Sequence, residues 1–326
     1  MNPLRIGILS TASIVPRFVG AAGTLEDCVI TALASRNLAR AEEKAALFRI
    51  PQAFGSYQEL SASDDVDIVY IATINSEHAS CARLALEHGK HVFCEKPFAL
   101  KPDEIRDLFS LARAKGLFVM EMQKCVFLPV IQELKKRIRA GEFGRITMAD
   151  FSSSFDAGYN SWMFDASKGG VPLFSNASYS LQLMQYLFDS FAVEQTGLCT
   201  RADSPVENQF AAVMRMDNGI LFTNKTSTAS ETIHMGYLYG EKGYIELPDY
   251  WKARRAVLHF KGQDPIELTC PCEFELRYEL EHALACIRKG LSESPVMTEE
   301  MSVRAMETLD ALHRMWNPVK IGRAHV

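Results

Sequence analysis

The sequence predicts an α/β protein with an N-terminal Rossmann domain built on a parallel sheet. A C-terminal α/β domain with a large, open, mostly antiparallel sheet is expected to follow. The chain has 326 residues, more than a single domain usually holds. Short apolar runs alternate with helical patterns over the first ~120 residues, which is typical of βαβ units. Beyond Arg145 the strand-like segments instead alternate apolar and polar residues, as half-buried antiparallel strands do. We place the domains at residues 1–122 and 123–320.

The first domain is expected to begin with a strand and to continue as strands and helices in turn. The segment 66–72 is apolar apart from Asp67 and follows the acidic turn Asp64-Asp65, which suits a strand covered on both faces. A later helix has Pro102 at its start and Gly116 just beyond its end, where these residues are favoured. Strands are expected at 4–9, 29–34, 66–72, 91–94 and 117–120, and helices at 14–22, 39–48, 76–88 and 102–114.

The second domain is expected to be a large sheet backed by helices. Asp217-Asn218-Gly219 separates two alternating segments and is a strong hairpin signal. Strands are expected at 146–155, 210–216, 220–226 and 244–247, and helices at 130–140, 273–289 and 301–315. The pattern ends near Trp316, and we interpret residues 321–326 as a non-native tail.

Composition restricts the partners of this protein. Its formal net charge is −5 and its pI about 6.0, which argues against nucleic acid or an anionic membrane as the main partner. No apolar run reaches the ~18 residues of a membrane span, and the first residues lack the pattern of a signal peptide. We therefore expect a cytoplasmic protein with a small-molecule substrate.

The eight cysteines do not have the spacing of a metal site. None forms a Cys-x-x-Cys pair. Cys270-Pro271-Cys272 is the closest pair, and no second pair or nearby histidine completes a zinc set. We expect reduced thiols and no metal ion.

The turn after the first strand is a degenerate phosphate loop. A dinucleotide fold favours Gly-x-Gly-x-x-Gly here, because the backbone must approach a pyrophosphate at a helix N-terminus. This chain has small residues instead of the later glycines, and hydroxyl groups that can donate to phosphate. An ordinary strand-to-helix turn is the alternative. The residues expected to contact the cofactor are Ser10, Thr11, Ala12 and Ile14.

The end of the second strand bears on the choice of cofactor. An NAD site usually has an acidic residue there, bonded to the ribose 2′-hydroxyl. This chain has Ser35 and Arg36, and an arginine can hold a 2′-phosphate. We expect NADP to be preferred, with NAD as a cofactor that can also be used. A solvated arginine without a ligand is the alternative for Arg36.

Four motifs, taken in order, resemble the Gfo/Idh/MocA family, the glucose-fructose oxidoreductase and inositol dehydrogenase group. They are Ala-Thr-x-Asn-x-x-His at 72–78, Glu95-Lys96-Pro97, the glycine pair at 169–170 and Gly-Glu-Lys-Gly-Tyr-Ile-Glu at 240–246. The resemblance covers residues 4–316. It implies a Rossmann domain followed by an open-faced domain whose sheet forms one wall of the active site. It also implies a homo-oligomer, a dimer or a tetramer.

The resemblance places Lys96 beside the nicotinamide and the reacting hydroxyl or carbonyl group, and Glu95 on the nicotinamide ribose or amide. Further cofactor contacts are expected from Thr73, Asn75 and His78. Pro97 biases Lys96 towards an extended turn at the carboxyl edge of the sheet, where ligands bind. The family often has this peptide bond in cis, and we expect the same here.

A second catalytic group is expected on the helix after the glycine pair. The family commonly has Asp and then His four residues later, where this chain has Ser175 and Tyr179. Residues four apart share a helix face, so both can point into the cleft. We expect Tyr179 to exchange the proton of the substrate hydroxyl, with the Lys96 ammonium favouring its phenolate. The alternative for Tyr179 is a core aromatic that packs with Tyr186 and Phe188.

Substrate contacts are expected from Gln123, Lys124, Trp162 and Ser175. Together these features predict an NADP-dependent oxidoreductase that transfers hydride between nicotinamide and a sugar, polyol or related hydroxy or carbonyl compound. Two alternatives remain open: a non-catalytic nucleotide-binding regulator on the same fold, and an NAD-dependent glycoside hydrolase.

Overall fold

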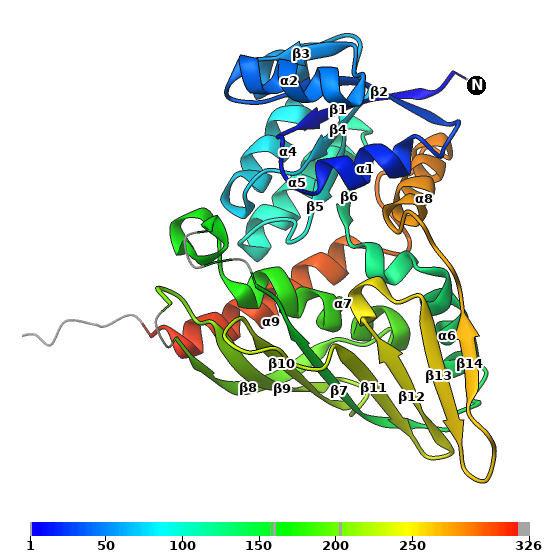
Figure 1. Ribbon diagram of the computed structural model, residues 1–326. Coiled ribbons are helices and arrows are strands. Elements are labelled where there is room, and N and C mark those ends of the chain that lie inside the picture. Colours follow the sequence, from blue (N-terminus) through cyan, green and yellow to red (C-terminus); the bar gives the residue numbers. More distant parts are fainter. Residues whose placement is uncertain (1, 157, 159–160, 202–203, 319–326) are drawn as a thin grey trace, which may run out of the picture.

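The computed structural model describes residues 2–156, 158, 161–201 and 204–318. Its strands form two sheets in separate parts of the molecule (Figure 1). One sheet has six parallel strands and the other has eight mostly antiparallel strands, so the predicted fold class is confirmed. No helix among the described residues is long and apolar enough to cross a membrane.

The six-stranded sheet has the order β3-β2-β1-β4-β5-β6, in which the strand order reverses between β1 and β4. Ligands of such sheets bind at the carboxyl ends of the strands near this reversal. Residues 28–34, 68–71 and 91–95 are almost continuously apolar because helices cover both faces. The strands are β1 (Leu4–Leu9), β2 (Cys28–Ala34), β3 (Gln52–Phe54), β4 (Ile68–Ile71), β5 (His91–Glu95) and β6 (Val119–Met122).

The helices of this domain follow the predicted pattern, with α3 and strand β3 as the additions. These two elements have six and three residues, too few for a clear periodicity. The expected helix 76–88 begins as a 3₁₀ turn, η1 (Asn75–Glu77), and continues as α4 (His78–Glu87). The others are α1 (Val15–Ala22), α2 (Leu38–Phe48), α3 (Tyr57–Ala62) and α5 (Pro102–Lys115).

The eight-stranded sheet has the order β14-β13-β12-β11-β7-β10-β9-β8. Among the described strand pairs of this sheet, only β7–β10 is parallel. The predicted hairpin at Gly219 joins β9 and β10. The strands are β7 (Ile146–Ser154), β8 (Ala192–Thr200), β9 (Gln209–Met216), β10 (Leu221–Ser227), β11 (Met235–Gly240), β12 (Gly243–Pro248), β13 (Arg255–Phe260) and β14 (Ile266–Thr269).

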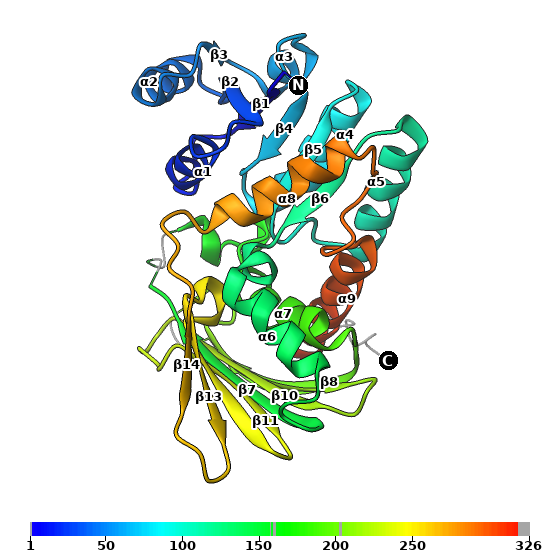
Figure 2. The ribbon, with the colours of Figure 1, turned by 90° about the vertical axis from the view of Figure 1, so that its right-hand side faces the viewer.

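Helices cover one face of this sheet and leave the other open. Figure 2 shows α6 (Pro129–Arg139), α7 (Ser178–Phe188) and α9 (Glu299–Trp316) on the covered face. Buried and exposed residues accordingly alternate along β9. The short turns of this domain are η2 (Lys124–Phe127), η3 (Trp162–Phe164), η4 (Ala166–Lys168), the π turn η5 (Leu173–Ala177) and η6 (Tyr250–Lys252).

The chain returns to the first domain near its end. Helix α8 (Leu276–Arg288) packs against α1, as Figure 2 shows. The Val119 amide of β6 then donates to the Ser292 carbonyl oxygen at 3.0 Å. Helix α8 therefore packs on the first domain, although it lies far from that domain in sequence.

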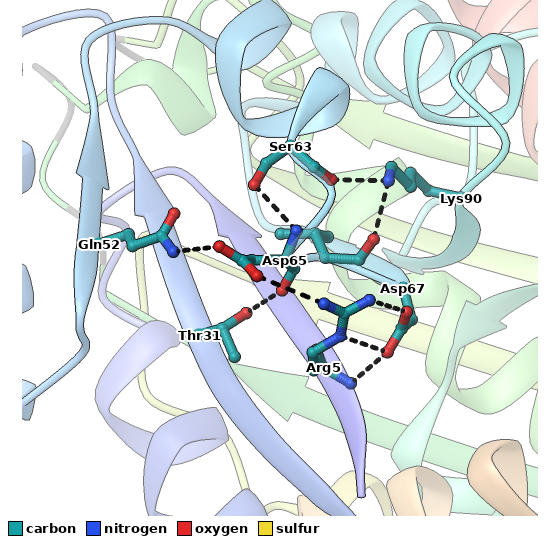
Figure 3. Close-up of polar contacts among 8 residues, drawn as sticks. Arg5, Thr31, Gln52, Ser63, Asp65, Asp67 and Lys90 are labelled. Carbon is teal, nitrogen blue, oxygen red and sulfur yellow. Dashed lines mark hydrogen bonds and ion pairs between the residues drawn. The ribbon is translucent and has the colours of Figure 1, made fainter. Parts of the chain in front are cut away.

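A polar cluster fixes the opposite, amino edge of the first sheet (Figure 3). Arg5 of β1 binds Asp67, just before β4, with donor–acceptor distances of 2.7 Å from Nη2 and 3.0 Å from Nε. Burial opposes ionisation of Asp67, but the Arg5 hydrogen bonds outweigh it and lower the pKa of this carboxyl. Lys90 Nζ donates to the carbonyl oxygens of Ser63 and Val66. The Arg5–Asp67 bonds tie β1 to the start of β4 at this edge.

Candidate active site

A cleft of about 770 Å³ lies at the carboxyl edge of the six-stranded sheet. One wall comes from the residues that follow β1, β2, β4 and β5. The other wall comes from the end of β7, the turns η3, η5 and η6, and helices α7 and α8. The cleft therefore crosses from the first domain to the second and has room for a dinucleotide with a small substrate.

The phosphate loop uses serine where the motif has glycine. Ser10 has φ of 101°, a conformation that costs a residue with a side chain about 1 kcal/mol or more. The Ser10 hydroxyl compensates locally by accepting the Ala12 amide at 3.1 Å. Ser10, Thr11, Ala12 and Ile14 all line the cleft, ahead of the N-terminus of α1. The loop thus presents small residues to the cleft directly before a helix N-terminus.

Two arginines follow β2: Arg36 lies in the loop after the strand, and Arg40 lies in the first turn of α2. Ser35 is buried and its hydroxyl accepts the Asn37 amide at 3.3 Å, so it shapes the turn. Arg36 and Arg40 both line the cleft, and neither guanidinium pairs with another described residue. Arg40 was not predicted from the sequence. Its position in the first helical turn after the Asn37 cap could have indicated that it lies near Arg36.

The Asn75–His78 turn supports the cleft from behind. Asn75 Nδ2 donates to the Gly169 carbonyl oxygen at 2.9 Å and so joins the two walls. The His78 ring lies between the carbonyl oxygens of Pro97, at 2.8 Å, and Thr73, at 3.2 Å. Both residues and Thr73 line the cleft. Because the polar atoms of His78 are engaged by the backbone, its placement indicates support of the turn more than contact with a cofactor.

Lys96 and Tyr179 come from opposite walls and meet in the cleft. The Lys96–Pro97 peptide bond is cis, as expected. Lys96 Nζ lies 4.3 Å from the centre of the Tyr179 ring and donates to the Ser175 carbonyl oxygen at 2.5 Å. Glu95 lies beside them and accepts the Tyr70 hydroxyl at 2.6 Å. An amine and a phenol are therefore available to one ligand.

Burial sets the protonation of this pair. It lowers the pKa of Lys96 to about 8, against the opposing effect of the Glu95 and Glu121 carboxylates. Burial also raises the pKa of Tyr179 well above its ordinary value, and Glu95 adds to that rise. The expectation that the ammonium would favour a Tyr179 phenolate is therefore wrong. Tyr179 holds its proton, and Lys96 is the group of the two that titrates near neutral pH.

The glycine pair positions the second wall. Gly170 has no room for a side chain, because a Cβ would lie 1.8 Å from the Trp162 carbonyl oxygen. The chain then enters the π turn η5, a local feature often found at functional sites. This turn places Ser175 and Asn176 on the cleft. The Ser175 hydroxyl is buried and has no hydrogen-bond partner among the described residues, so it is free for a ligand.

The expected substrate residues divide into two groups. Lys124 and Trp162 line the cleft, whereas Gln123 does not. Gln123 is fully buried, and its Nε2 donates to the Gln182 side chain. Direct contact between Gln123 and a substrate is therefore not supported, because the chain turns at the end of β6 and sends successive side chains in opposite directions.

Two cleft residues had no usable signal in the sequence. Trp251 comes from η6 and Glu279 from α8, both distant along the chain. Burial raises the pKa of Glu279 well above its ordinary value, and its Oε2 has no partner among the described residues. Burial also lowers the pKa of Lys124 to about 8. Lys124 Nζ lies 5.6 Å from the Tyr179 ring centre, so a second amine borders the same site.

The fold and this cleft define a two-domain oxidoreductase that works with a nicotinamide dinucleotide. The chain belongs to the GFO/IDH/MocA family. The family's N-terminal model, described as an oxidoreductase family with an NAD-binding Rossmann fold, matches residues 4–123. The GFO/IDH/MocA C-terminal domain matches residues 131–246. The protein is an NAD(P)-dependent dehydrogenase or reductase.

Curated relatives match over nearly the whole chain. The scyllo-inositol 2-dehydrogenase (NADP(+)) of Bacillus subtilis (strain 168) is 31% identical, over 94% of this chain and 95% of that protein. The trans-1,2-dihydrobenzene-1,2-diol dehydrogenase of Mus musculus is 29% identical, over 94% of this chain and 95% of that protein.

Solved structures show the same fold. A levoglucosan dehydrogenase in complex with NADH and levoglucosan aligns with a TM-score of 0.86 and 19% identity, over 95% of this chain and 96% of that chain. A 3-ketoreductase from Actinomadura kijaniata, in complex with NADP, aligns with a TM-score of 0.85 and 21% identity, over 95% and 97% of the two chains. At these sequence identities the structural similarity is evidence for the fold alone.

Proposed function

We propose that this protein is an NADP-dependent oxidoreductase that transfers hydride between nicotinamide and a sugar, polyol or related hydroxy or carbonyl compound. The observation that carries the proposal is the Lys96–Tyr179 pair, whose amine lies 4.3 Å from the phenol ring centre in a cleft at the carboxyl edge of the Rossmann sheet. The names of the curated relatives, which act on a diol and on an inositol, support the substrate class.

The preference for NADP is supported by the end of β2. Arg36 and Arg40 offer two guanidinium groups on the cleft that have no partner among the described residues, and Ser35, instead of an acidic residue, follows β2. Guanidinium groups bind phosphate through paired, charge-assisted hydrogen bonds. These two arginines would hold the 2′-phosphate of NADP, and the Ser10–Ile14 loop would hold the pyrophosphate.

The protonation states of Lys96 and Tyr179 give the two residues different roles. The bound nicotinamide supplies or accepts the hydride. Tyr179 carries its proton and donates it to the carbonyl oxygen in the reductive direction. Lys96, with a pKa of about 8, stabilises negative charge on that oxygen and exchanges a proton readily near neutral pH. In the oxidative direction the neutral amine of Lys96 would accept the hydroxyl proton, and protonated Tyr179 would donate a hydrogen bond to the substrate oxygen.

The substrate end of the cleft is polar on one side and aromatic on the other. Ser175, Lys124 and Glu279 offer hydrogen-bonding groups, and Trp162 and Trp251 offer flat apolar surfaces. Sugars and cyclic polyols carry hydroxyl groups around an apolar ring, and such a lining complements them. This supports a polyhydroxylated substrate.

The open face of the second sheet supports a homo-oligomer. Met148, Val213 and Leu221 are large exposed residues of three adjacent strands, and Leu198 of β8 is 82% exposed. Apolar side chains on an uncovered sheet face favour pairing with a second copy. Size-exclusion chromatography with light scattering measures the oligomeric state. The wild type should be a dimer or tetramer, and Leu198→Asp should weaken the association between subunits.

A substrate panel tests the proposed activity. Aldoses, inositols and vicinal diols would be offered with NADP and with NAD while the nicotinamide absorbance is followed. We expect turnover with at least one polyol and a higher kcat/KM with NADP. Cofactor binding without any turnover would favour the regulator. Release of a sugar from a glycoside without net change in absorbance would favour the glycoside hydrolase.

A further inference from the structure

Glu121 is a buried carboxylate behind the active site. It lies in β6, is 2% exposed and does not line the cleft. Its Oε1 accepts the Phe98 amide at 3.1 Å. Its Oε2 accepts Gln182 Nε2 at 2.8 Å and the Ser302 hydroxyl at 2.5 Å. Every donor is buried, so water does not compete for these bonds.

These three donors belong to three separate elements. Phe98 follows the cis Lys96–Pro97 turn, Gln182 lies one turn after Tyr179 on α7, and Ser302 lies on α9. One carboxylate thus joins the loop that carries Lys96 to the helix that carries Tyr179. No other described carboxylate bonds to both segments.

Burial outweighs the hydrogen bonds to Glu121, so the pKa of this carboxyl lies above its ordinary value. The hydrogen bonds from Ser302, Gln182 and Phe98 oppose that rise. All three partners donate, which is the arrangement that stabilises an ionised carboxylate. The Glu121 charge in turn opposes the loss of the Lys96 proton, second only to Glu95. The other titratable groups that face Lys96 are Arg17 of α1, His78 of α4, Lys124 and Cys125 of η2, and Tyr179 of α7.

We propose that Glu121 is a positioning residue, which fixes the distance between Lys96 and Tyr179 and favours the ammonium form of Lys96. The kinetic part of this proposal rests on the proposed function, whereas the part about Lys96 protonation does not. The physical reason is that a reacting pair held by two domains needs a rigid connection. A misplacement of about 1 Å can cost two orders of magnitude in rate.

The test is Glu121→Gln, which keeps the size, removes the charge and replaces one acceptor oxygen by an NH2 group that cannot accept. Competitive labelling of lysines with acetic anhydride at a series of pH values, read by mass spectrometry, reports the titration of Lys96 without any substrate. We expect the Lys96 titration midpoint to fall by about half a pH unit or more. With a substrate from the panel, kcat should fall about tenfold or more while the Kd for NADP stays within about twofold.

Two further variants separate charge from position. Gln182→Met breaks the connection to α7 and keeps the Glu121 charge, so kcat should fall while the Lys96 midpoint stays. Glu207→Gln removes another buried carboxylate, one that pairs with His313 at 2.7 Å outside the cleft lining. This variant should lower Tm without changing kcat or the Lys96 titration midpoint, and it controls for a general loss of stability.

Clear outcomes would overturn the proposal. An unchanged Lys96 midpoint in folded Glu121→Gln would remove the electrostatic role. Wild-type kcat in both Glu121→Gln and Gln182→Met would remove the positioning role. If the panel finds no substrate, the labelling result still decides the electrostatic role, so failure of the proposed function is distinguishable from failure of this inference.

Discussion

Lys96 Nζ lies 4.3 Å from the centre of the Tyr179 ring, although the two residues belong to different domains. The ammonium stands over the ring, a cation–π arrangement, and donates its hydrogen bond to the Ser175 carbonyl oxygen. Burial affects the two groups differently. Lys96 becomes easier to deprotonate, and Tyr179 becomes harder to deprotonate. The proposed hydride-transfer activity depends on that pair.

Removing the Tyr179 hydroxyl should stop most turnover. Tyr179→Phe keeps the ring under Lys96 and removes the proton donor, so kcat should fall by about 10²–10⁴, the usual contribution of a general acid. Steady-state kinetics and cofactor titration would measure this, with the Kd for NADP expected to stay within about twofold. Tyr186→Phe, on the same helix but bonded to Gln132, is the matched control. Equal losses in both variants would contradict a catalytic role.

Lys96→Met should remove activity and stabilise the fold. The pKa of Lys96 is about 8 in the folded protein and 10.5 ordinarily, so the unfolded chain binds this proton more tightly. Lys96 therefore subtracts stability below about pH 8, and that penalty disappears as pH rises towards 10.5. The variant should have a higher Tm than the wild type near pH 7, with a smaller difference near pH 10. Lys101→Met, at a 75% exposed side chain, should change Tm little. A lower Tm for Lys96→Met near pH 7 would contradict this.

The arginines at the end of β2 should decide cofactor preference. Arg36→Ala and Arg40→Ala each remove a charge-assisted contact of about 1.5–3 kcal/mol, so kcat/KM for NADP should fall tenfold or more. The value for NAD should stay within about twofold. Arg83→Ala, an exposed arginine outside the cleft, is the control. Parallel losses with both cofactors would show that these arginines do not bind the 2′-phosphate.

Gly170 should not tolerate a side chain. Gly170→Ala would place Cβ 1.8 Å from the Trp162 carbonyl oxygen, so the backbone of one wall must move. We expect a lower Tm and a higher KM for the substrate. Gly23→Ala is the control, because its Cβ would lie 3.4 Å from the nearest atom and its φ of −64° suits alanine. A thermal melt with Gly170→Ala equal to the wild type would contradict the close approach.

The sequence predicted the longer helices and the buried parallel strands well, because each has a characteristic pattern of apolar residues. The strands of the parallel sheet are buried on both faces, so their composition alone distinguishes them from helices. Short elements such as β3 escaped because three residues carry no period. In the second domain β8, β11, β13 and β14 were missed. Their pairing depends on contacts that are distant in sequence, which local patterns do not encode.

The sequence predicted only some residues of the candidate site, because the others reach the cleft through contacts that are distant in sequence. Motifs placed Lys96 and Tyr179 in the cleft because both follow recognisable turns. Glu279 was missed because helix α8 reaches the cleft only through tertiary packing. Gln123 was assigned the wrong direction, since the facing of a side chain at a strand end depends on the next turn. The protonation of Tyr179 was wrong because burial, its main cause, is not visible in a sequence.

The most direct measurement is the rate of hydride transfer in a double-mutant cycle. Single-turnover oxidation of NADPH, with a carbonyl substrate from the panel, would be followed in wild type, Tyr179→Phe, Lys96→Met and the double variant. If the two groups act as one unit, the double variant should be about as slow as the slower single variant. Wild-type rates in either single variant, or losses that simply multiply in the double variant, would contradict the account.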